Sequence, residues 1–251
     1  MSDMAEVARV AVCTARWREE LRPKLDTFGF AIIEPGPDAP QLDEVMAELG
    51  EPVEYYFGTK LALEPQEGSE NLQFTTRGMP LHADSIFNAG PSVKFIGMQC
   101  VTAPAAGGET LISNTAAFFD NAPADLIESV RDIVVEYRNR IDGYYKDGVA
   151  GEHPRIVPVQ VDPDTGVERL VMGFSDPEDP MRTHDAVVVG YSDSDSAELL
   201  RRIEEILYLP NVMYSHKWRV GQLMVIDNRR VLHGRAPFEG QARKLIRLSV
   251  A

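Results

Sequence analysis

Short apolar runs separated by turn residues dominate this chain, which predicts many short strands and a few helices. Helical spacing of apolar positions predicts helices at 16–28, 42–49, 115–120, 123–131 and 195–207. Strands are expected at 30–33, 54–57, 71–76, 81–85, 93–101, 111–113, 133–137, 169–174, 186–189, 213–218, 223–227 and 243–250. This order favours a mostly β fold with flanking helices, arranged as a barrel or as a double-stranded β-helix, the jelly roll.

Residues 139–190 are the least regular part of the sequence and are rich in Gly, Pro and Asp. A long region of this kind is often a lid or a substrate-binding insert. Residues 60–70 form a second polar stretch and are expected to be a loop. No repeat, low-complexity tract or linker divides the chain. We therefore expect one domain over 1–251, with a lid or substrate insert at 139–190.

Composition narrows the classes of partner. Lys and Arg number 25 against 39 Asp and Glu, a net charge of 25 − 39 = −14, which disfavours nucleic acid and anionic membranes as partners. Cys13 and Cys100 match no zinc or disulfide spacing and are expected to be reduced, buried thiols. Neither a signal peptide nor a membrane-spanning run is visible. We expect a cytoplasmic protein with a small-molecule substrate; the pattern leaves its oligomeric state open.

The stretch Leu81–Ser85 contains the first candidate chemistry. His82 and Asp84 are two residues apart, so on a strand both side chains point to the same face. An imidazole and a carboxylate so placed can occupy adjacent positions on one metal ion. A 2-His-1-carboxylate iron site needs a second histidine.

The second histidine lies in a more specific motif near the C-terminus. Asp227-Asn228-Arg229 ends a predicted strand, His233-Gly234-Arg235 follows, and Arg243 and Arg247 come ten and fourteen residues after His233. Together with the Gly107–Thr110 turn, this pattern resembles the taurine/2,4-D dioxygenase-like branch of the Fe(II)- and 2-oxoglutarate-dependent oxygenases. The resemblance covers roughly 80–114 and 213–250.

The resemblance implies a jelly roll in which His82, Asp84 and His233 bind Fe(II), leaving three positions for 2-oxoglutarate and O2. Arg243, with Thr110, should bind the distal carboxylate of 2-oxoglutarate. Arg247 shares a strand face with Arg243 and should lie nearer the metal, by the C1 carboxylate or an acidic substrate group. The roles of the two arginines are open to exchange.

The expected reaction is oxidation of a C–H bond of a small polar acid, an amino acid or a natural-product intermediate, with release of succinate and CO2. Hydroxylation is expected first, and desaturation or ring formation is also open. Asp84 disfavours halogenation, since related halogenases carry a small residue there. Two alternatives are an inert metal-binding jelly roll, acting as a sensor or structural protein, and a cupin-like metal enzyme that uses no 2-oxoglutarate.

Substrate contacts are expected from side chains that precede the metal strand or belong to the insert, namely Tyr55, Tyr56, Gln73, Phe74 and Tyr144. Arg247 of the C-terminal strand is a further candidate, for an acidic group of the substrate. The other histidines, His153, His184 and His216, lack partners at metal spacing and are expected to be solvated or in loops. Arg229, Arg230 and Arg235 are expected to be structural or at the pocket rim. Asp227 and Asn228 are interpreted as turn-capping residues or as supports for the metal ligands.

Overall fold

The computed structural model describes residues 11–55, 57–87, 92–140, 153–163, 165–240 and 242–251. Its helices are α2 (Trp17–Phe28), α3 (Leu42–Ala47), α4 (Thr115–Asn121), α5 (Ala124–Arg131), α6 (Asp193–Leu207) and the 3-10 turn η1 (Leu72–Phe74). Its strands are β1 (Val12–Cys13), β2 (Phe30–Ile33), β3 (Lys60–Leu63), β4 (Met79–His82), β5 (Phe95–Thr102), β6 (Thr110–Asn114), β7 (Val135–Asn139), β8 (Arg155–Ile156), β9 (Val159–Val161), β10 (Glu168–Leu170), β11 (His184–Val188), β12 (Met213–His216), β13 (Leu223–Asp227), β14 (Val231–Arg235) and β15 (Lys244–Val250).

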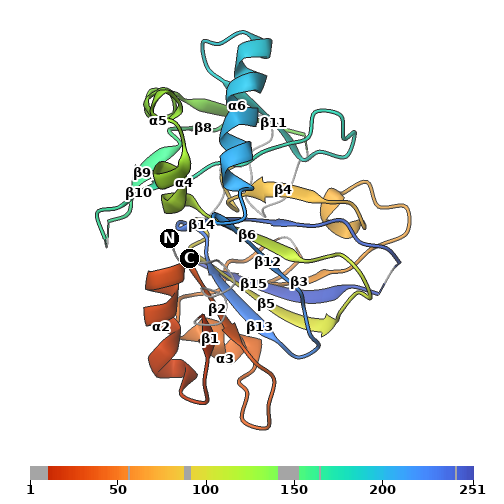
Figure 1. Cartoon of the computed structure of the whole chain (residues 1–251). Coiled ribbons are helices and arrows are strands. Elements are labelled where there is room, and N and C mark those ends of the chain that lie inside the picture. Colours follow the sequence, from red (N-terminus) through yellow and green to blue (C-terminus); the bar gives the residue numbers. More distant parts are fainter. Residues whose placement is uncertain (1–10, 56, 88–91, 141–152, 164, 241) are drawn as a thin grey trace.

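Two sheets of mostly antiparallel strands form the centre of the molecule (Figure 1). The larger sheet has six strands in the order β1-β2-β13-β5-β15-β3, and the smaller has four in the order β12-β6-β14-β4. Neighbouring strands in both sheets are far apart in sequence, as in the pairing of β13 with β2 and β5. The mostly β prediction with flanking helices is confirmed.

The alternation of side chains along the strands separates the core into layers. On β13, Met224 and Ile226 pack with Val231 of β14 between the two sheets, whereas Val225 packs under α2 and α3 on the outer face. The outer face of the smaller sheet packs against α4, α5 and α6. The positions that face the space between the sheets therefore alternate with apolar positions that face the helices.

Residues 172–174 of the predicted insert lie beside β4, the strand that carries His82. Ala83 N–H donates to Met172 O (2.9 Å) and Phe174 N–H donates to Leu81 O (2.9 Å), so 172–174 run beside β4. Gly173 sits opposite His82, and a Cβ at this position would lie 2.5 Å from Phe87 Cζ. Glycine is therefore needed for the close approach of the two segments.

Three element predictions were wrong. Residues 60–63, expected in a loop, form β3 on the edge of the larger sheet, where main-chain pairing with β15 suffices for a strand with few fully buried side chains. Residues 71–76, expected as a strand, contain η1 instead, because the Asn71 side chain accepts from Gln73 N–H and starts a turn. No ladder strand forms at 54–57 in its described residues, where Tyr55 makes only an isolated bridge to Gly58.

Helix α2 contains a proline in its interior. Pro23 lies inside the helix, and the element still begins at Trp17 and ends at Gly29, whose φ of 77° is left-handed. Trp17, Leu21 and Leu25 remain on the buried face. The burial of this face stabilises the helix against the loss of one backbone hydrogen bond at Pro23.

Candidate active site

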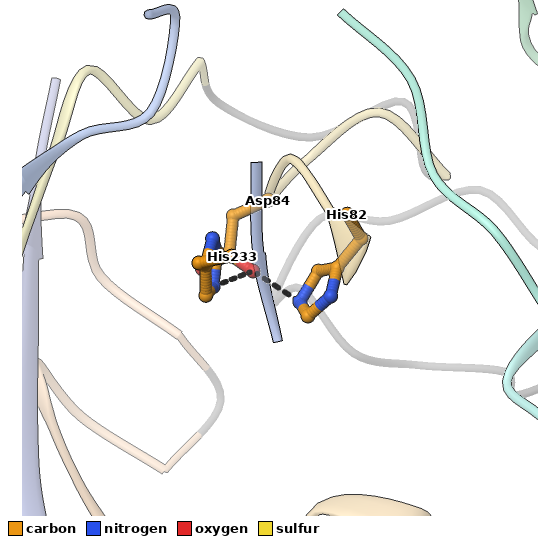
Figure 2. A group of neighbouring side chains, drawn as sticks. All are labelled: His82, Asp84 and His233. Atoms are coloured by element: carbon orange, nitrogen blue, oxygen red, sulfur yellow. Dashed lines mark ion pairs between the residues drawn. The ribbon is translucent and has the colours of Figure 1, made fainter. Parts of the chain in front are cut away.

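His82, Asp84 and His233 meet at one end of the space between the sheets (Figure 2). His82 ends β4, and His233 is its cross-strand partner on β14. Asp84 Oδ1 lies 3.4 Å from His82 Nε2 and 3.7 Å from His233 Nε2. One ligand atom from each residue lies within 4.8 Å of the others, a spacing that a single metal ion could bridge.

The protonation states around the cluster suit a cation. Burial raises the pKa of Asp84, but Arg247 and the two histidines outweigh burial and hold that pKa well below its usual range. Burial, with the charge of His82, lowers the pKa of His233 to about 3. His82 Nδ1 lies 2.9 Å from Pro80 O, and a His82 ring that donates to this carbonyl when a metal binds has Nε2 available as the ligand atom. A carboxylate and neutral imidazoles are the forms that ligate metals.

Arg243 lies immediately before β15 and Arg247 lies in its middle, and both line the same cavity of about 670 Å³ as the three metal-ligand candidates. Arg243 Nε donates to Gly108 O (2.9 Å), and its terminal nitrogens carry no hydrogen bond in the described structure. A Cβ on Gly108 would lie 2.9 Å from Arg243 Cδ, so the glycine turn makes room for the guanidinium. Burial lowers the pKa of Arg243 to about 9, which leaves it charged at neutral pH.

Thr110 lies on the inner face of β6 beside these arginines and is 2% exposed. Its Oγ1 accepts from Trp218 Nε1–H (2.9 Å). Because a hydroxyl has one proton and two acceptor positions, this bond directs the Thr110 proton away from the indole. Thr110 lines the cavity and so has a donor to offer a bound carboxylate.

The remaining wall of the cavity comes from loop 71–80, the segment 174–184 and Tyr208. Gln73 lines it as expected, but Phe74 does not, because successive side chains in the 3-10 turn η1 point about 120° apart. Tyr55 lies behind Arg247, with its hydroxyl 3.3 Å from Nη2. The other two substrate candidates, Tyr56 and Tyr144, lie outside the described residues.

The sequence reasoning missed His184 as a residue of the wall, whereas the structural role expected of Arg235 is confirmed. His184, expected to be solvated or in a loop, is 3% exposed on β11 and stacks on Phe87 with ring centroids 3.8 Å apart. Arg235, expected to be structural or at the rim, is buried and donates to the carbonyls of Leu72, Gln73 and Arg77. Arg235 thus fixes the loop that carries Gln73. His216, also expected to be solvated, is buried on β12, while His153 is exposed as expected.

Known proteins are similar to this chain in sequence and in fold. The family described as "Taurine catabolism dioxygenase TauD, TfdA family" matches residues 7–249. The chain belongs to this family. It is an iron- and 2-oxoglutarate-dependent oxygenase, and the resemblance in the sequence motifs is confirmed.

In the described residues, no helix combines the length and apolar character needed to cross a bilayer.

Two curated relatives match over most of their length. The 3-((Z)-2-isocyanoethenyl)-1H-indole synthase of Fischerella ambigua is 27% identical over 243 residues, covering 94% of this chain and 84% of that protein. The tyrosine isonitrile desaturase of Pseudomonas aeruginosa is 29% identical over 220 residues, covering 84% and 72%. The solved structure of PvcB, described as an Fe, alpha-ketoglutarate dependent oxygenase from an isonitrile synthetic pathway, superposes with a TM-score of 0.68 at 25% identity, covering 95% and 80%.

Proposed function

We propose that this chain binds Fe(II) through His82, Asp84 and His233 and couples the decarboxylation of 2-oxoglutarate to oxidation of a C–H bond in a small organic acid. The observation that carries the proposal is one cavity lined by these three side chains and by two buried arginines. When bound, iron with 2-oxoglutarate and O2 supplies the oxidising chemistry and releases succinate and CO2. The donor set fits this metal, because two imidazoles and one carboxylate are the ligands of non-haem Fe(II) oxygenases.

Arg243 and Thr110 are the residues proposed to bind the distal carboxylate of 2-oxoglutarate. The unpaired terminal nitrogens of Arg243 match a carboxylate bidentately, and the Thr110 hydroxyl adds a third donor. Arg247 is proposed to bind a second anionic group, an acidic group of the substrate. Its Nη1 already lies 3.1 Å from Asp84 Oδ2, so an anion bound there would lie close to the metal.

The substrate is proposed to be an acid with an aromatic body, of the kind found among natural-product intermediates. Phe87, Phe174 and Tyr208 line the cavity, and an aromatic body would pack against such rings. The two curated relatives are named for an isocyanoethenyl indole and for a tyrosine isonitrile. Isonitrile derivatives of aromatic amino acids are therefore the first substrates to test, with desaturation as well as hydroxylation as outcomes.

The fold supports two further parts of the proposal. The two sheets, with the inner apolar layer between them, are proposed to be the halves of a double-stranded β-helix. Residues 139–190 are proposed to act as the substrate wall and lid of one domain, since 174–176 and 182–184 line the cavity.

The test begins with apo-protein under anaerobic conditions, to which Fe(II) and then 2-oxoglutarate are added. A weak visible charge-transfer band should form, and it should be lost in His233→Ala and Asp84→Ala. Arg243→Gln should raise the Kd of 2-oxoglutarate about 100-fold, whereas Arg247→Gln should leave it within a few-fold and act on the substrate instead. If iron binds and no band forms, the oxygenase assignment fails in favour of a metal protein that uses no 2-oxoglutarate.

The second step adds O2 and candidate acids to the loaded enzyme and measures succinate against oxidised product. Substrate-dependent succinate formation by an isonitrile acid would support the aromatic-acid proposal. Iron and 2-oxoglutarate binding with no succinate from any acid would instead favour an inert binding protein.

A further inference from the structure

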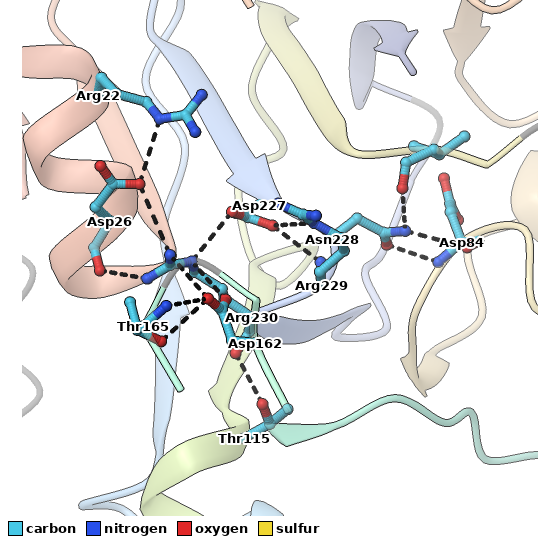
Figure 3. A network of polar contacts seen from close by, with 11 residues as sticks. Arg22, Asp26, Asp84, Thr115, Asp162, Thr165, Asp227, Asn228, Arg229 and Arg230 are labelled. Carbon is cyan, nitrogen blue, oxygen red and sulfur yellow. Dashed lines mark hydrogen bonds and ion pairs between the residues drawn. The ribbon is translucent and has the colours of Figure 1, made fainter. Parts of the chain in front are cut away.

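The Asn228 side chain is hydrogen-bonded to the main chain of Asp84 (Figure 3). Its Oδ1 accepts from Asp84 N–H (2.7 Å), and its Nδ2 donates to Asp84 O (3.1 Å) and to Val93 O (2.9 Å). The side chain is 5% exposed. One amide thus joins the turn at 228 to two main-chain positions more than 130 residues earlier, one of them the residue proposed as the carboxylate ligand.

Asp84 needs such support because it lies beyond the end of its strand. The strand β4 ends at His82, and Ala83 makes the last main-chain bond to the neighbouring segment. Ser85 then has a φ of 68°, the single positive value of a non-glycine residue in the described structure. That conformation is strained for a residue with a side chain and persists only where the surroundings impose it. The Asn228 amide supplies partners for both main-chain groups of Asp84 at this bend.

The turn that carries Asn228 is itself held firmly. Asn228 N–H donates to Lys94 O (2.9 Å), and Asp227 N–H donates to Gly29 O (2.8 Å). Arg230 Nε lies 3.2 Å from Asp162 Oδ2 and 3.3 Å from Asp227 Oδ2, all with buried side chains (Figure 3). Hydrogen bonds and ion pairs therefore hold the turn against the end of α2, the segment before β5 and the insert.

We propose that Asn228 is a positioning residue for the iron site, which it touches only through Asp84. By fixing the main chain of Asp84, it sets the distance from this carboxylate to Nε2 of His82 and of His233. This inference rests on the proposed function, in which Asp84 is a metal ligand. It extends that function to a residue outside the cavity lining, whose loss should weaken metal binding without removing a ligand.

The test measures the Kd of Co(II) for the apo-protein by calorimetry at a temperature where each variant is folded. Asn228→Ala should weaken Co(II) binding about 10- to 100-fold, the range found when a group supporting a metal ligand is lost. Asn228→Asp keeps the acceptor for Asp84 N–H but places a negative charge against two carbonyls, so it should also weaken binding. With Fe(II) and 2-oxoglutarate, the visible band should shift or broaden in both variants.

The matched control is Asn114→Ala, which removes an amide that accepts from Ala116 and Ala117 N–H at the start of α4, away from the cluster. It should lower the melting temperature and leave the Kd of Co(II) unchanged. If the Asn228 variants lower the melting temperature but bind Co(II) as tightly as the wild type, the role is structural and the proposal is overturned.

Two measurements keep the outcomes separate. Wild-type protein that binds no Co(II), or Asp84→Ala that binds it undiminished, would defeat the proposed function and not the role of Asn228 alone. If neither Asn228 variant folds, amide exchange in the wild-type apo-protein decides. The Asp84 amide should be strongly protected, and exchange at the rate of an unstructured peptide would overturn the proposal.

Discussion

Arg247 forms an ion pair with one carboxylate oxygen of Asp84, and the other oxygen faces the histidines. Arg247 Nη1 lies 3.1 Å from Oδ2, while Oδ1 faces the two histidine Nε2 atoms. One oxygen is therefore engaged by the guanidinium, and the other is presented to the metal position. This arrangement favours binding of a metal through one oxygen of Asp84.

Replacing Arg247 with Met should make metal binding more sensitive to acid. Burial raises the pKa of Asp84, and in the variant the largest opposing charge is gone, so protonation competes with the metal at higher pH. The ratio of the Co(II) Kd at pH 5.5 to that at pH 7.5 should exceed the wild-type ratio by about threefold or more. Equal ratios in the two proteins would show that Arg247 does not control the ionisation of Asp84.

Replacing Trp218 with Phe should weaken 2-oxoglutarate binding about fivefold, the effect of one lost hydrogen bond, because Thr110 loses the bond that orients its hydroxyl. The Kd of Co(II) should not change. Trp17→Phe is the matched control, since Trp17 is the first residue of α2 and packs on the outer face of the larger sheet. Titration of 2-oxoglutarate into the Co(II)-loaded proteins distinguishes the two, and equal affinities would remove Trp218 from the cosubstrate site.

Replacing Gly173 with Ala should displace Phe87, because the new Cβ would lie 2.5 Å from the Phe87 ring and 3.1 Å from His82 Cβ. We expect a loss of about 1–3 kcal/mol in the free energy of unfolding and an altered substrate KM. Gly36→Ala is the control, because no atom lies within 4 Å of a Cβ there. Denaturant unfolding of both variants gives the comparison, and equal stabilities would mean that the wall adapts freely.

The apo-protein should lose stability as the pH falls from 6.5 toward 4. Burial lowers the pKa of His216 to about 4 and those of His184 and His233 to about 3. Below pH 6.5 the unfolded chain therefore binds protons that the folded chain does not, and each histidine contributes a slope of up to about 1.4 kcal/mol per pH unit. Urea unfolding from pH 7.5 to 5 should show a shallower slope for His216→Gln, by about one proton.

The grouping of His82, Asp84 and the two arginines was predictable in part from spacing. Residues two or four positions apart were expected to share one face of a strand, and these side chains do line one cavity, although Asp84 lies just after β4 and Arg243 just before β15. The structure brings these four residues and His233 to one cavity. Spacing alone could not show that the segment of His82 and the segment of His233 meet. That expectation came from the resemblance of the sequence motifs to the oxygenase family.

The substrate wall was not predictable because its residues are placed by contacts between segments remote in sequence. His184 is buried where its ring stacks on Phe87. The Arg235 side chain is held by hydrogen bonds to three carbonyls of a loop 158–163 residues earlier in the chain. The run Ala186–Val189 did predict a strand at this place, and extending it back by two residues would have included His184. The strand at 60–63 carried too weak an apolar pattern to be recognised.

The main-chain pairing of 172–174 with β4 has a consequence for protein engineering. Because these bonds join backbone atoms, they do not depend on the identity of the side chains that face the cavity. Phe174 and Ser175 can therefore be randomised in a library while Gly173 is kept and the proposed metal ligands stay in register. New substrate preferences should be reachable in this segment without redesigning the catalytic centre.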